Sequence, residues 1–370
     1  MAPDKFKGSC TAREAADAIM LGLRDAWGEG WSASVIPLAD GGDGTVAAFL
    51  EGGAAAQHVR TVNALGAPVD AVYARLGLAA ILEMAAASGL AQLSPPLAPR
   101  EATTYGTGLM IADAIAGGAR RIVLGIGGSA TTDGGAGALA ALGVRFLDAA
   151  GAELAPTPTA LAALASVDAS GLRWHAAEGS FEIACDVENP LLGPNGAAAV
   201  YGPQKGAVPE DVAFLEGVLA RFADAAVAAT GRDLRDLPGA GAAGGLGWGL
   251  ATFLGAQLVR GFDVVAQLTG LADALRGSAL CVTGEGRIDG QSLEGKVIAG
   301  VAALARAADV EVLAIGGSVD PAAERELLRR GVTCVALIDD PADRERAMRA
   351  APEFIRAAAA RWARGRSAPV

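Results

Sequence analysis

A chain of 370 residues is too long for one ordinary hydrophobic core, so we expect two domains. Its formal net charge of −11 argues against non-specific nucleic-acid binding, which needs clustered Lys and Arg side chains. Although 52% of the residues are hydrophobic, no stretch approaches about 18 uncharged apolar residues, and we expect no membrane span. The four cysteines lie far apart without a CxxC pair, which favours a reduced, cytoplasmic protein over a disulfide framework or a zinc site.

The predicted elements alternate between helix and strand along the chain. Residues 11–27 have helical apolar spacing, and Thr11 with Glu14 three residues later forms a capping box. Strands are expected within residues 32–45, 121–126, 181–187, 279–286 and 310–320. Further helices are expected over residues 106–118, 208–229, 246–260, 295–308 and 342–364. This alternation favours the α/β class, with a mostly parallel sheet covered on both faces.

The stretch GIGGSATTDGGAG at residues 125–137 holds six glycines in thirteen positions. Glycine in a packed element costs about 0.5–1 kcal/mol relative to alanine, so this concentration needs a reason. A strand, a glycine turn and a helix start would present free backbone N–H groups that bind a phosphate or a carboxylate. The alternative is a tight loop whose Ser129, Thr131, Thr132 and Asp133 only cap the helix.

Two other glycine motifs fit their patterns less well. GAGAAG at residues 239–244 matches GxGxxG, but RDLRDLP precedes it in place of a strand. GQSLEGKV at residues 290–297 misses a phosphate-binding P-loop because Val297 stands where Ser or Thr would bind magnesium. Gly295 and Lys296 at a helix start could still place a cation beside a phosphate.

Acidic residues follow several of the apolar strands. Asp40 and Asp43 lie in ADGGDGT, Asp186 in CDVENP, and Glu285 and Asp289 in GEGRID. Isolated aspartates in glycine turns are mostly turn formers, whereas several that converge would suit Mg²⁺, which takes one or two carboxylates with phosphate oxygens and water. The two histidines, His58 and His175, stand in unremarkable surroundings, so histidine acid–base chemistry is not expected.

These motifs together resemble those of the bacterial glycerate kinases. The resemblance extends from residue 2 to about residue 320, and its blocks occur in the family's order: APDKFKGSCTAREAADAI, PLADGGDGT, EMAAASGL, TTYGTG, GIGGSATTDGGAGALAALGVRFLD, CDVENPLLGPNGAAAVYGPQKGA, GAAGGLG and VTGEGRIDGQSLEGK. It implies transfer of the γ-phosphate of ATP to D-glycerate, most often to give the 2-phosphoglycerate product. ATP and Mg²⁺ would be the cofactors.

The resemblance also implies the architecture. A discontinuous Rossmann-like parallel-sheet domain would comprise residues 1–65 with 275–370, and an inserted second α/β domain residues 66–274. The active site would lie in the cleft between them. The chain departs from the family at its beginning, where a short hydrophobic strand usually precedes the APD motif; without that strand the first sheet is expected to lack a partner. It also has Lys5 where Ser is frequent.

We assign the site residues as hypotheses. Asp186, at a strand end, would orient or deprotonate the substrate hydroxyl, and Lys7 and Lys205 would hold the substrate carboxylate or the transferring phosphoryl group. The remaining candidates are Gly127, Gly128, Ser129, Thr131, Thr132 and Lys296 for the nucleotide phosphates, Asn189 and Gln204 for the substrate, and Asp43, Asp289, Asp40 and Glu285 for Mg²⁺.

Two rival functions stay open at this point. One is a kinase for a related short hydroxy acid, because motifs do not show the pocket walls that select a three-carbon substrate. The other is a non-catalytic hydroxy-acid sensor, which would need the ligand loops but not the acids and lysines. The expected partners are small molecules, with no nucleic acid and no membrane, and the sequence leaves a homodimer open.

Overall fold

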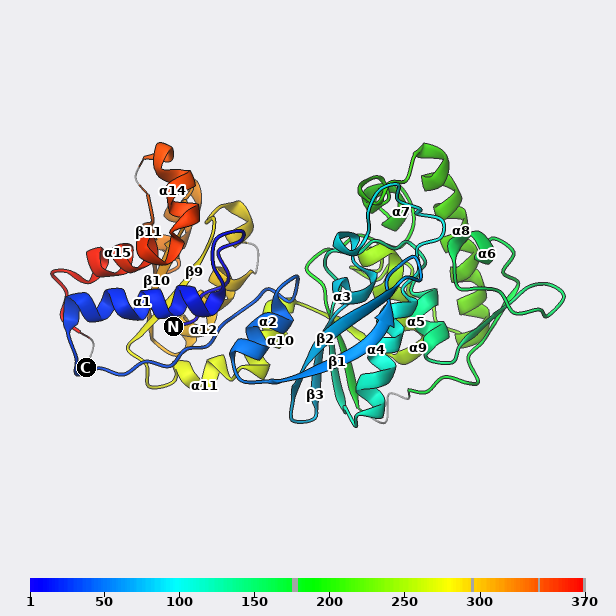
Figure 1. Ribbon diagram of the computed structural model, residues 1–370, viewed down its shortest axis with the longest axis horizontal. Coiled ribbons are helices and arrows are strands. Elements are labelled where there is room, and N and C mark those ends of the chain that lie inside the picture. Colours follow the sequence, from blue (N-terminus) through cyan, green and yellow to red (C-terminus); the bar gives the residue numbers. More distant parts are fainter. Residues whose placement is uncertain (175–178, 294–295, 339, 369–370) are drawn as a thin grey trace. The chain divides into compact units, whose positions relative to one another are not determined.

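The computed structural model describes residues 1–174, 179–293, 296–338 and 340–368, so His175 and Gly295 lie outside the described residues. The chain forms two compact units (Figure 1). Unit 1 comprises Met1–Asp40, Ala47–Gly53 and Arg260–Val370, and unit 2 comprises Gly41–Val46 and Ala54–Val259. Both units mix helices with parallel strands, as expected for the α/β class.

Unit 2 is built on a six-stranded sheet in the order β1-β2-β3-β4-β7-β8. Its strands are β1 (Ala55–Val62), β2 (Pro68–Leu76), β3 (Ala79–Glu83), β4 (Arg121–Gly125), β7 (Ser180–Ala184) and β8 (Gln257–Val259). The hairpin pairs β1–β2 and β2–β3 are antiparallel, and the pairs from β3 to β8 are parallel. Strand β4 lies between two parallel neighbours, which explains its continuous apolar run. A small separate sheet pairs β5 (Arg145–Leu147) with β6 (Ser166–Asp168).

The helices of unit 2 surround a core rich in small side chains. They are α3 (Ala85–Ser88), α4 (Tyr105–Ala116), α5 (Ala136–Ala141), α6 (Pro158–Leu161), α7 (Ala197–Tyr201), α8 (Pro209–Thr230) and α9 (Leu246–Leu254), with 3₁₀ turns η1 (Leu90–Gln92), η3 (Pro203–Lys205) and η4 (Ala242–Gly245). The ring of Phe222 packs edge-to-face against Phe146 and Trp248, with ring centroids 5.3 and 5.0 Å away. These rings anchor α8 and α9 against the small sheet.

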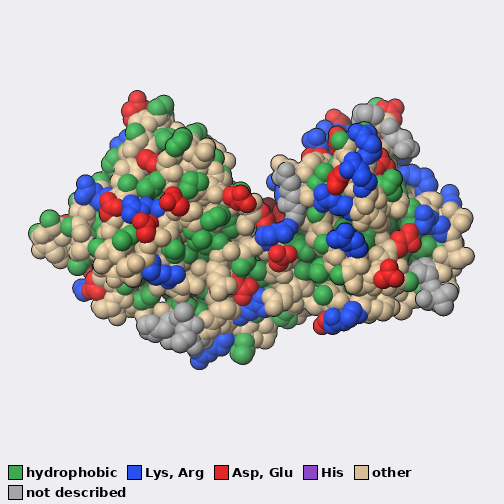
Figure 2. Space-filling view, turned by 180° about the vertical axis from the view of Figure 1, so that it is seen from behind, with side chains coloured by type: hydrophobic (Ala, Val, Ile, Leu, Met, Phe, Trp, Pro, Cys, Tyr) green, Lys and Arg blue, Asp and Glu red, His purple; other side chains and the backbone are tan. Residues whose placement is uncertain are grey.

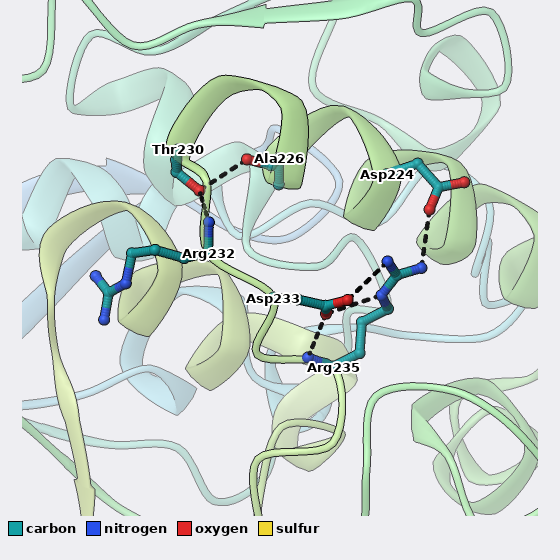
Figure 3. A network of polar contacts seen from close by, with 6 residues as sticks. All are labelled: Asp224, Ala226, Thr230, Arg232, Asp233 and Arg235. Carbon is teal, nitrogen blue, oxygen red and sulfur yellow. Dashed lines mark hydrogen bonds and ion pairs between the residues drawn. The ribbon is translucent and has the colours of Figure 1, made fainter.

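A polar network fixes the chain where α8 ends (Figure 3). Thr230 Oγ1 donates to Ala226 O and accepts from Arg232 N, and Arg235 forms ion pairs with Asp233 and Asp224. The carbonyl of Arg235 in turn accepts a hydrogen bond of 2.9 Å from Leu191 N. The network therefore supports the segment that follows β7.

Unit 1 contains a parallel sheet of β9 (Leu280–Glu285), β10 (Glu311–Gly316) and β11 (Val332–Ala336), in the order β11-β10-β9. Beyond β9 the extended residues 1–4 continue the hydrogen bonding, because Ala2 N donates to Val282 O and Asp4 N to Gly284 O. Residues 36–38 pair with residues 1–3 in the same way and are not a regular strand. Strand β9 is thus the edge of this three-stranded sheet, and residues 1–4 lie beside it with two backbone hydrogen bonds without forming a strand of their own.

Unit 1 also contains helices. They are α1 (Ala12–Trp27), α2 (Thr45–Glu51, whose first two residues belong to unit 2), α10 (Gly261–Leu268), α11 (Leu271–Leu275), α12 (Val297–Ala307), α13 (Pro321–Arg329), α14 (Arg344–Arg349) and α15 (Ala351–Ala363), with turns η5 (Gly290–Leu293) and η6 (Pro341–Asp343). The capping box at Thr11 and Glu14 is confirmed, with hydrogen bonds of 3.2 and 2.9 Å.

Two expected helices end differently in the structure. The helix expected over 246–260 stops at Leu254, because Gly255 adopts a left-handed φ of 73° and the chain then enters β8. The helix expected over 342–364 divides into α14 and α15 at Ala350. Pro352 lies in the first turn of α15, where its missing N–H has no cost.

The unit boundaries also differ from the expected domain boundaries at 65/66 and 274/275. Strand β1 belongs to unit 2 because it pairs along its whole length with β2. Helices α10 and α11 belong to unit 1, where they pack against α12.

Acidic and basic side chains are interspersed on the face drawn in Figure 2. Among the described residues, no helix combines the length and the apolar character that crossing a bilayer would need.

The contact between α1 and α15 leads to a first prediction. A Cβ atom added at Gly22 would lie 2.2 Å from Arg356 O and 2.8 Å from Ala359 Cβ. Gly22→Ala should therefore lower the free energy of unfolding by about 1–2 kcal/mol, since overpacking outweighs the gain of about 1 kcal/mol in helix propensity. Gly217 in α8 is exposed with no atom within 4 Å of its added Cβ, so Gly217→Ala should stabilise slightly. Urea unfolding of both variants checks this, and equal effects would contradict it.

Candidate functional site

The glycine loop follows β4 at the carboxyl end of the unit 2 sheet. Gly127 and Gly128 are exposed at its tip and Ser129 is half-buried. Gly128 has a φ of 71°, a left-handed conformation that favours glycine. We call these three residues the glycine tip.

Hydrogen bonds to residues 84–90 hold both sides of the glycine tip. Three backbone bonds of 2.9 Å do this: Met84 N to Gly125 O, Leu90 N to Gly128 O, and Ala130 N to Ser88 O. None of the bonds that anchor the loop within the described residues uses the N–H of Gly127, Gly128 or Ser129. These three donors therefore remain for an anionic ligand.

The segment ADGGDGT brings Asp43 next to the glycine tip. A Cβ atom added at Gly127 would lie 3.6 Å from Asp43 N, and one added at Gly125 only 2.6 Å from Gly41 O. Glu83, at the end of β3, accepts a hydrogen bond of 2.7 Å from Val46 N and so caps the start of α2. Two sequence motifs distant along the chain thus lie side by side in unit 2.

Asp133 has a structural role within the loop. Its buried carboxylate accepts hydrogen bonds from Thr104 N, Thr104 Oγ1, Gly135 N and Gly137 N, at 2.7 to 3.1 Å. Burial raises the pKa of Asp133, and these four hydrogen bonds oppose that rise. Helix α5 begins only at Ala136, and Asp133 already occupies two of its first N–H groups. The expectation that this helix start offers free donors to an anion is therefore wrong.

Thr131, Thr132 and Lys205 lie in the interior of unit 2. Both threonine hydroxyls are buried without a hydrogen-bond partner among the described residues. Lys205 is 1% exposed, and its Nζ donates a hydrogen bond of 2.6 Å to Thr131 O. Burial lowers the pKa of Lys205 to about 7, and the charge of Asp133 partly offsets this shift. None of the three is exposed to bind a ligand directly in this structure.

The residues after β7 divide into exposed and anchored groups. Asp186 is exposed two residues beyond the strand, and Gln204 is exposed within η3. Asn189 is anchored, because its Oδ1 accepts from Tyr201 Oη at 2.7 Å and its Nδ2 donates to Asn195 O at 2.8 Å.

Unit 1 carries an acidic group of Asp4, Asp40 and Glu285 where β9 and its extended neighbours end. Burial raises the pKa of Asp4 to about 7, and the charges of Asp40 and Glu285 add to this rise. Burial also raises the pKa of Glu285, while Ser292 and Lys296 lower it. The acidic group thus concentrates negative charge at the carboxyl end of the sheet, where ligands of α/β proteins bind.

The other residues predicted for the site lie around this acidic group. Asp289 pairs with Arg287 at 3.1 Å and accepts from Gln291 N at 2.9 Å, as in an Asx turn. Lys296 donates to Gln291 Oε1 at 3.1 Å. Lys7 is exposed, and its backbone N lies 3.3 Å from a Cβ added at Gly286.

The donors of the acidic group fit a hard cation. Glu285 Oε1 is buried and has no hydrogen-bond partner among the described residues. The described residues hold no group of three or more His, Cys, Asp and Glu arranged around one metal position. Mg²⁺ needs only one or two carboxylates together with phosphate oxygens and water, so the carboxylates of Glu285 and Asp40 suit it.

Three residues of these sites were missed by the sequence reasoning. Asp4 stands in the APD motif, Thr104 in TTYGTG, and Glu83 in the otherwise apolar stretch AAILEMAAASGLA. The signal for Glu83 was its isolated charge. No sequence signal pointed to Thr104 or Asp4 beyond their place in the motifs, because the roles of both residues depend on tertiary neighbours.

Comparisons with known proteins match most of the chain. Residues 1–366 match the glycerate kinase family model. A glycerate kinase from Bacillus subtilis is 47% identical over 325 residues, covering 86% of this chain and 84% of the relative. A glycerate 2-kinase from Escherichia coli is 43% identical, with the same coverage. A crystal structure of a provisionally assigned glycerate kinase 2 from Salmonella typhimurium LT2 is similar with a TM-score of 0.87 and 42% identity, covering 98% of this chain and 96% of that one.

An α/β chain with a glycine loop and a separate acidic group has the parts that a phosphotransferase requires. The match over almost its entire length shows that the chain belongs to the glycerate kinase family, and it is a kinase.

The raised pKa of Asp4 gives a prediction about stability and pH. The folded protein retains the Asp4 proton up to about pH 7, whereas the unfolded chain releases it near 3.8, so this group makes the protein less stable as pH rises between those values. Asp4→Asn keeps an acceptor for Lys5 N but does not titrate. The difference in free energy of unfolding between Asp4→Asn and the wild type should therefore shift in favour of the variant from pH 4 to 7 and be constant above pH 8.

Urea unfolding at several pH values measures this difference. Asp40→Asn serves as the comparison variant. The charge of Asp40 raises the pKa of Asp4, so removing it should lower the pH at which the destabilisation by Asp4 is complete. A pH-independent gap between Asp4→Asn and the wild type would show that Asp4 does not titrate in this range.

Proposed function

We propose that the protein transfers the γ-phosphoryl group of ATP to D-glycerate and forms 2-phospho-D-glycerate and ADP. The glycine tip, with three N–H donors beside Asp43, is the observation that carries the ATP part of this proposal. The match to a relative named glycerate 2-kinase supports the 2-phospho product. The cleft implied by the resemblance stays a prediction.

The glycine tip would hold the nucleotide phosphates. Phosphoryl transfer asks the protein mainly to align the attacking oxygen with the γ-phosphorus and to stabilise negative charge. The N–H groups of Gly127, Gly128 and Ser129 supply such stabilisation without a lysine. Thr131 and Thr132 would act through the shape of the loop, since their hydroxyls are buried. Lys296 would provide a further phosphate contact.

Asp186 would act on the acceptor hydroxyl. Its exposed carboxylate can take the proton of the C2 hydroxyl as that oxygen attacks the γ-phosphorus and ADP leaves. A positioned base contributes about 10²–10⁴ in rate. Gln204, which is exposed, would bind glycerate, and Asn189 would support the Asp186 segment from its anchored position. Lys7, exposed in unit 1, remains the candidate for the substrate carboxylate or the transferring phosphoryl group.

Mg²⁺ would be held by the carboxylates of Glu285 and Asp40, with Asp43 and Asp289 as the other candidates. When bound, the ion neutralises charge on the nucleotide phosphates and polarises them. The buried, unpartnered Glu285 Oε1 is the observation that favours this choice.

The test of the function is an ADP-release assay with D-glycerate, L-glycerate and related short hydroxy acids, followed by NMR of the product. We expect ADP release to be fastest with D-glycerate. In the NMR spectrum of the product, the new phosphorus–proton coupling should appear at the proton attached to C2. Faster release with another acid would favour a kinase for that acid. Binding of the acids without any ADP release would favour a hydroxy-acid sensor.

The role of Asp186 gives the next prediction. Asp186→Asn should lower kcat by about 10²–10⁴ with little change in either KM, because the amide cannot accept the hydroxyl proton. Glu188→Gln, two residues further along the same exposed segment, is the matched control and should keep near-normal kcat. Turnover of Asp186→Asn within a few-fold of the wild type would remove Asp186 from the mechanism.

A further inference from the structure

Lys205 and Asp133 are the two charged residues that are buried in the part of the chain that the structure describes, with 1% and 0% of their surface exposed. Burial disfavours the ammonium form of Lys205 and lowers its pKa, and the charge of Asp133 opposes this effect. Charges are expensive to bury, and a buried charge persists only where a counter-charge and hydrogen bonds compensate it. This pair therefore needs a reason beyond packing.

Both charges bind the same short segment of the glycine loop. The Lys205 ammonium donates a hydrogen bond of 2.6 Å to the carbonyl of Thr131. The Asp133 carboxylate accepts hydrogen bonds from the N–H groups of Gly135 and Gly137. A cation thus binds a carbonyl and an anion binds amide hydrogens within seven residues of one loop. Each charge meets the end of the peptide dipole that it attracts.

Turn η4 supports this segment from another side. Gly134 N donates to Gly244 O at 2.9 Å, and a Cβ added at Gly244 would lie 2.0 Å from Thr131 O. Three successive residues there are left-handed, including Ala243 with a φ of 52°, which is rare for a residue with a side chain. This close backbone contact is possible only because Gly244 has no Cβ atom, and it places η4 directly against the Thr131 carbonyl.

We propose that Lys205 is a positioning residue of the kinase reaction, whose buried ammonium fixes residues 130–134 and thereby the glycine tip that receives the nucleotide phosphates. This inference rests on the proposed role of the glycine tip. Ala130, bonded to Ser88 O, joins the fixed segment directly to Ser129. In this role Lys205 touches no substrate, unlike the direct contact with carboxylate or phosphoryl group that the sequence suggested.

Steady-state kinetics of Lys205→Met tests the proposal. Removing the ammonium leaves the Thr131 carbonyl without its donor and Asp133 without a counter-charge, so the KM for ATP should rise at least about tenfold. The KM for D-glycerate should change less than about threefold, because the acceptor side is not touched. Lys205→Arg restores the charge and should recover part of the ATP affinity. Arg173→Met, an exposed cation of the same unit, should leave both values unchanged.

Other kinetic results would overturn the proposal. A rise confined to the KM for D-glycerate would indicate contact with the acceptor, and a fall in kcat with both KM values unchanged would indicate contact with the transferring group. Wild-type behaviour of Lys205→Met would show that the ammonium is dispensable. If Lys205→Met does not fold, Lys205→Arg carries the same test: it keeps the charge but alters the donor to Thr131 O, so its KM for ATP should still exceed the wild-type value, and a wild-type KM for ATP would overturn the proposal.

Hydrogen exchange separates this inference from the proposed function. In Lys205→Met, amide exchange should accelerate about tenfold in peptides covering residues 84–90 and 125–134, and not in peptides of β2. Uniform acceleration throughout unit 2 would indicate a merely structural role and overturn the proposal. If the wild type releases no ADP with any acid, the proposed function fails, while the exchange pattern still decides whether Lys205 fixes the loop.

Discussion

The glycine loop depends on the hydrogen bonds that the buried carboxylate of Asp133 accepts. This carboxylate gathers four hydrogen bonds from two separate stretches of chain, at Thr104 and at Gly135–Gly137. In the interior such bonds are worth more than in water, and leaving any of these donors unpaired would be costly. The loop therefore has one arrangement in which the Asp133 carboxylate and its four donors are all satisfied.

This constraint explains why so many glycines are needed nearby. Once Asp133 draws the backbone of residues 133–137 around itself, other backbone segments must approach within contact distance. A Cβ at Gly137 would lie 2.0 Å from Thr103 Oγ1, and one at Gly249 would lie 2.2 Å from Gly134 O. The glycine content is thus a consequence of close backbone packing as much as of ligand binding.

The sequence revealed the α/β class, the capping box at Thr11 and the position of the glycine loop, because those depend on local patterns. It could not separate exposed from buried members of the loop. Gly128 and Thr131 stand three residues apart in the same motif, yet Gly128 is exposed and Thr131 is buried. The sequence predicts a ligand-binding role for Lys205, because nothing in its local sequence shows that tertiary packing buries it. Helix ends at Gly255 and Ala350 depended on single residues within otherwise helical patterns.

The close approach at Gly125 has a consequence for redesign. A methyl group there would lie 2.6 Å from a backbone oxygen, so the junction between β4 and the loop has no room for variation. The exposed side chains of Val187, Glu188 and Gln204 carry no such restriction. Libraries that seek new acceptor acids should therefore diversify Gln204, the one of these positions proposed to contact the substrate, and leave the strand end untouched.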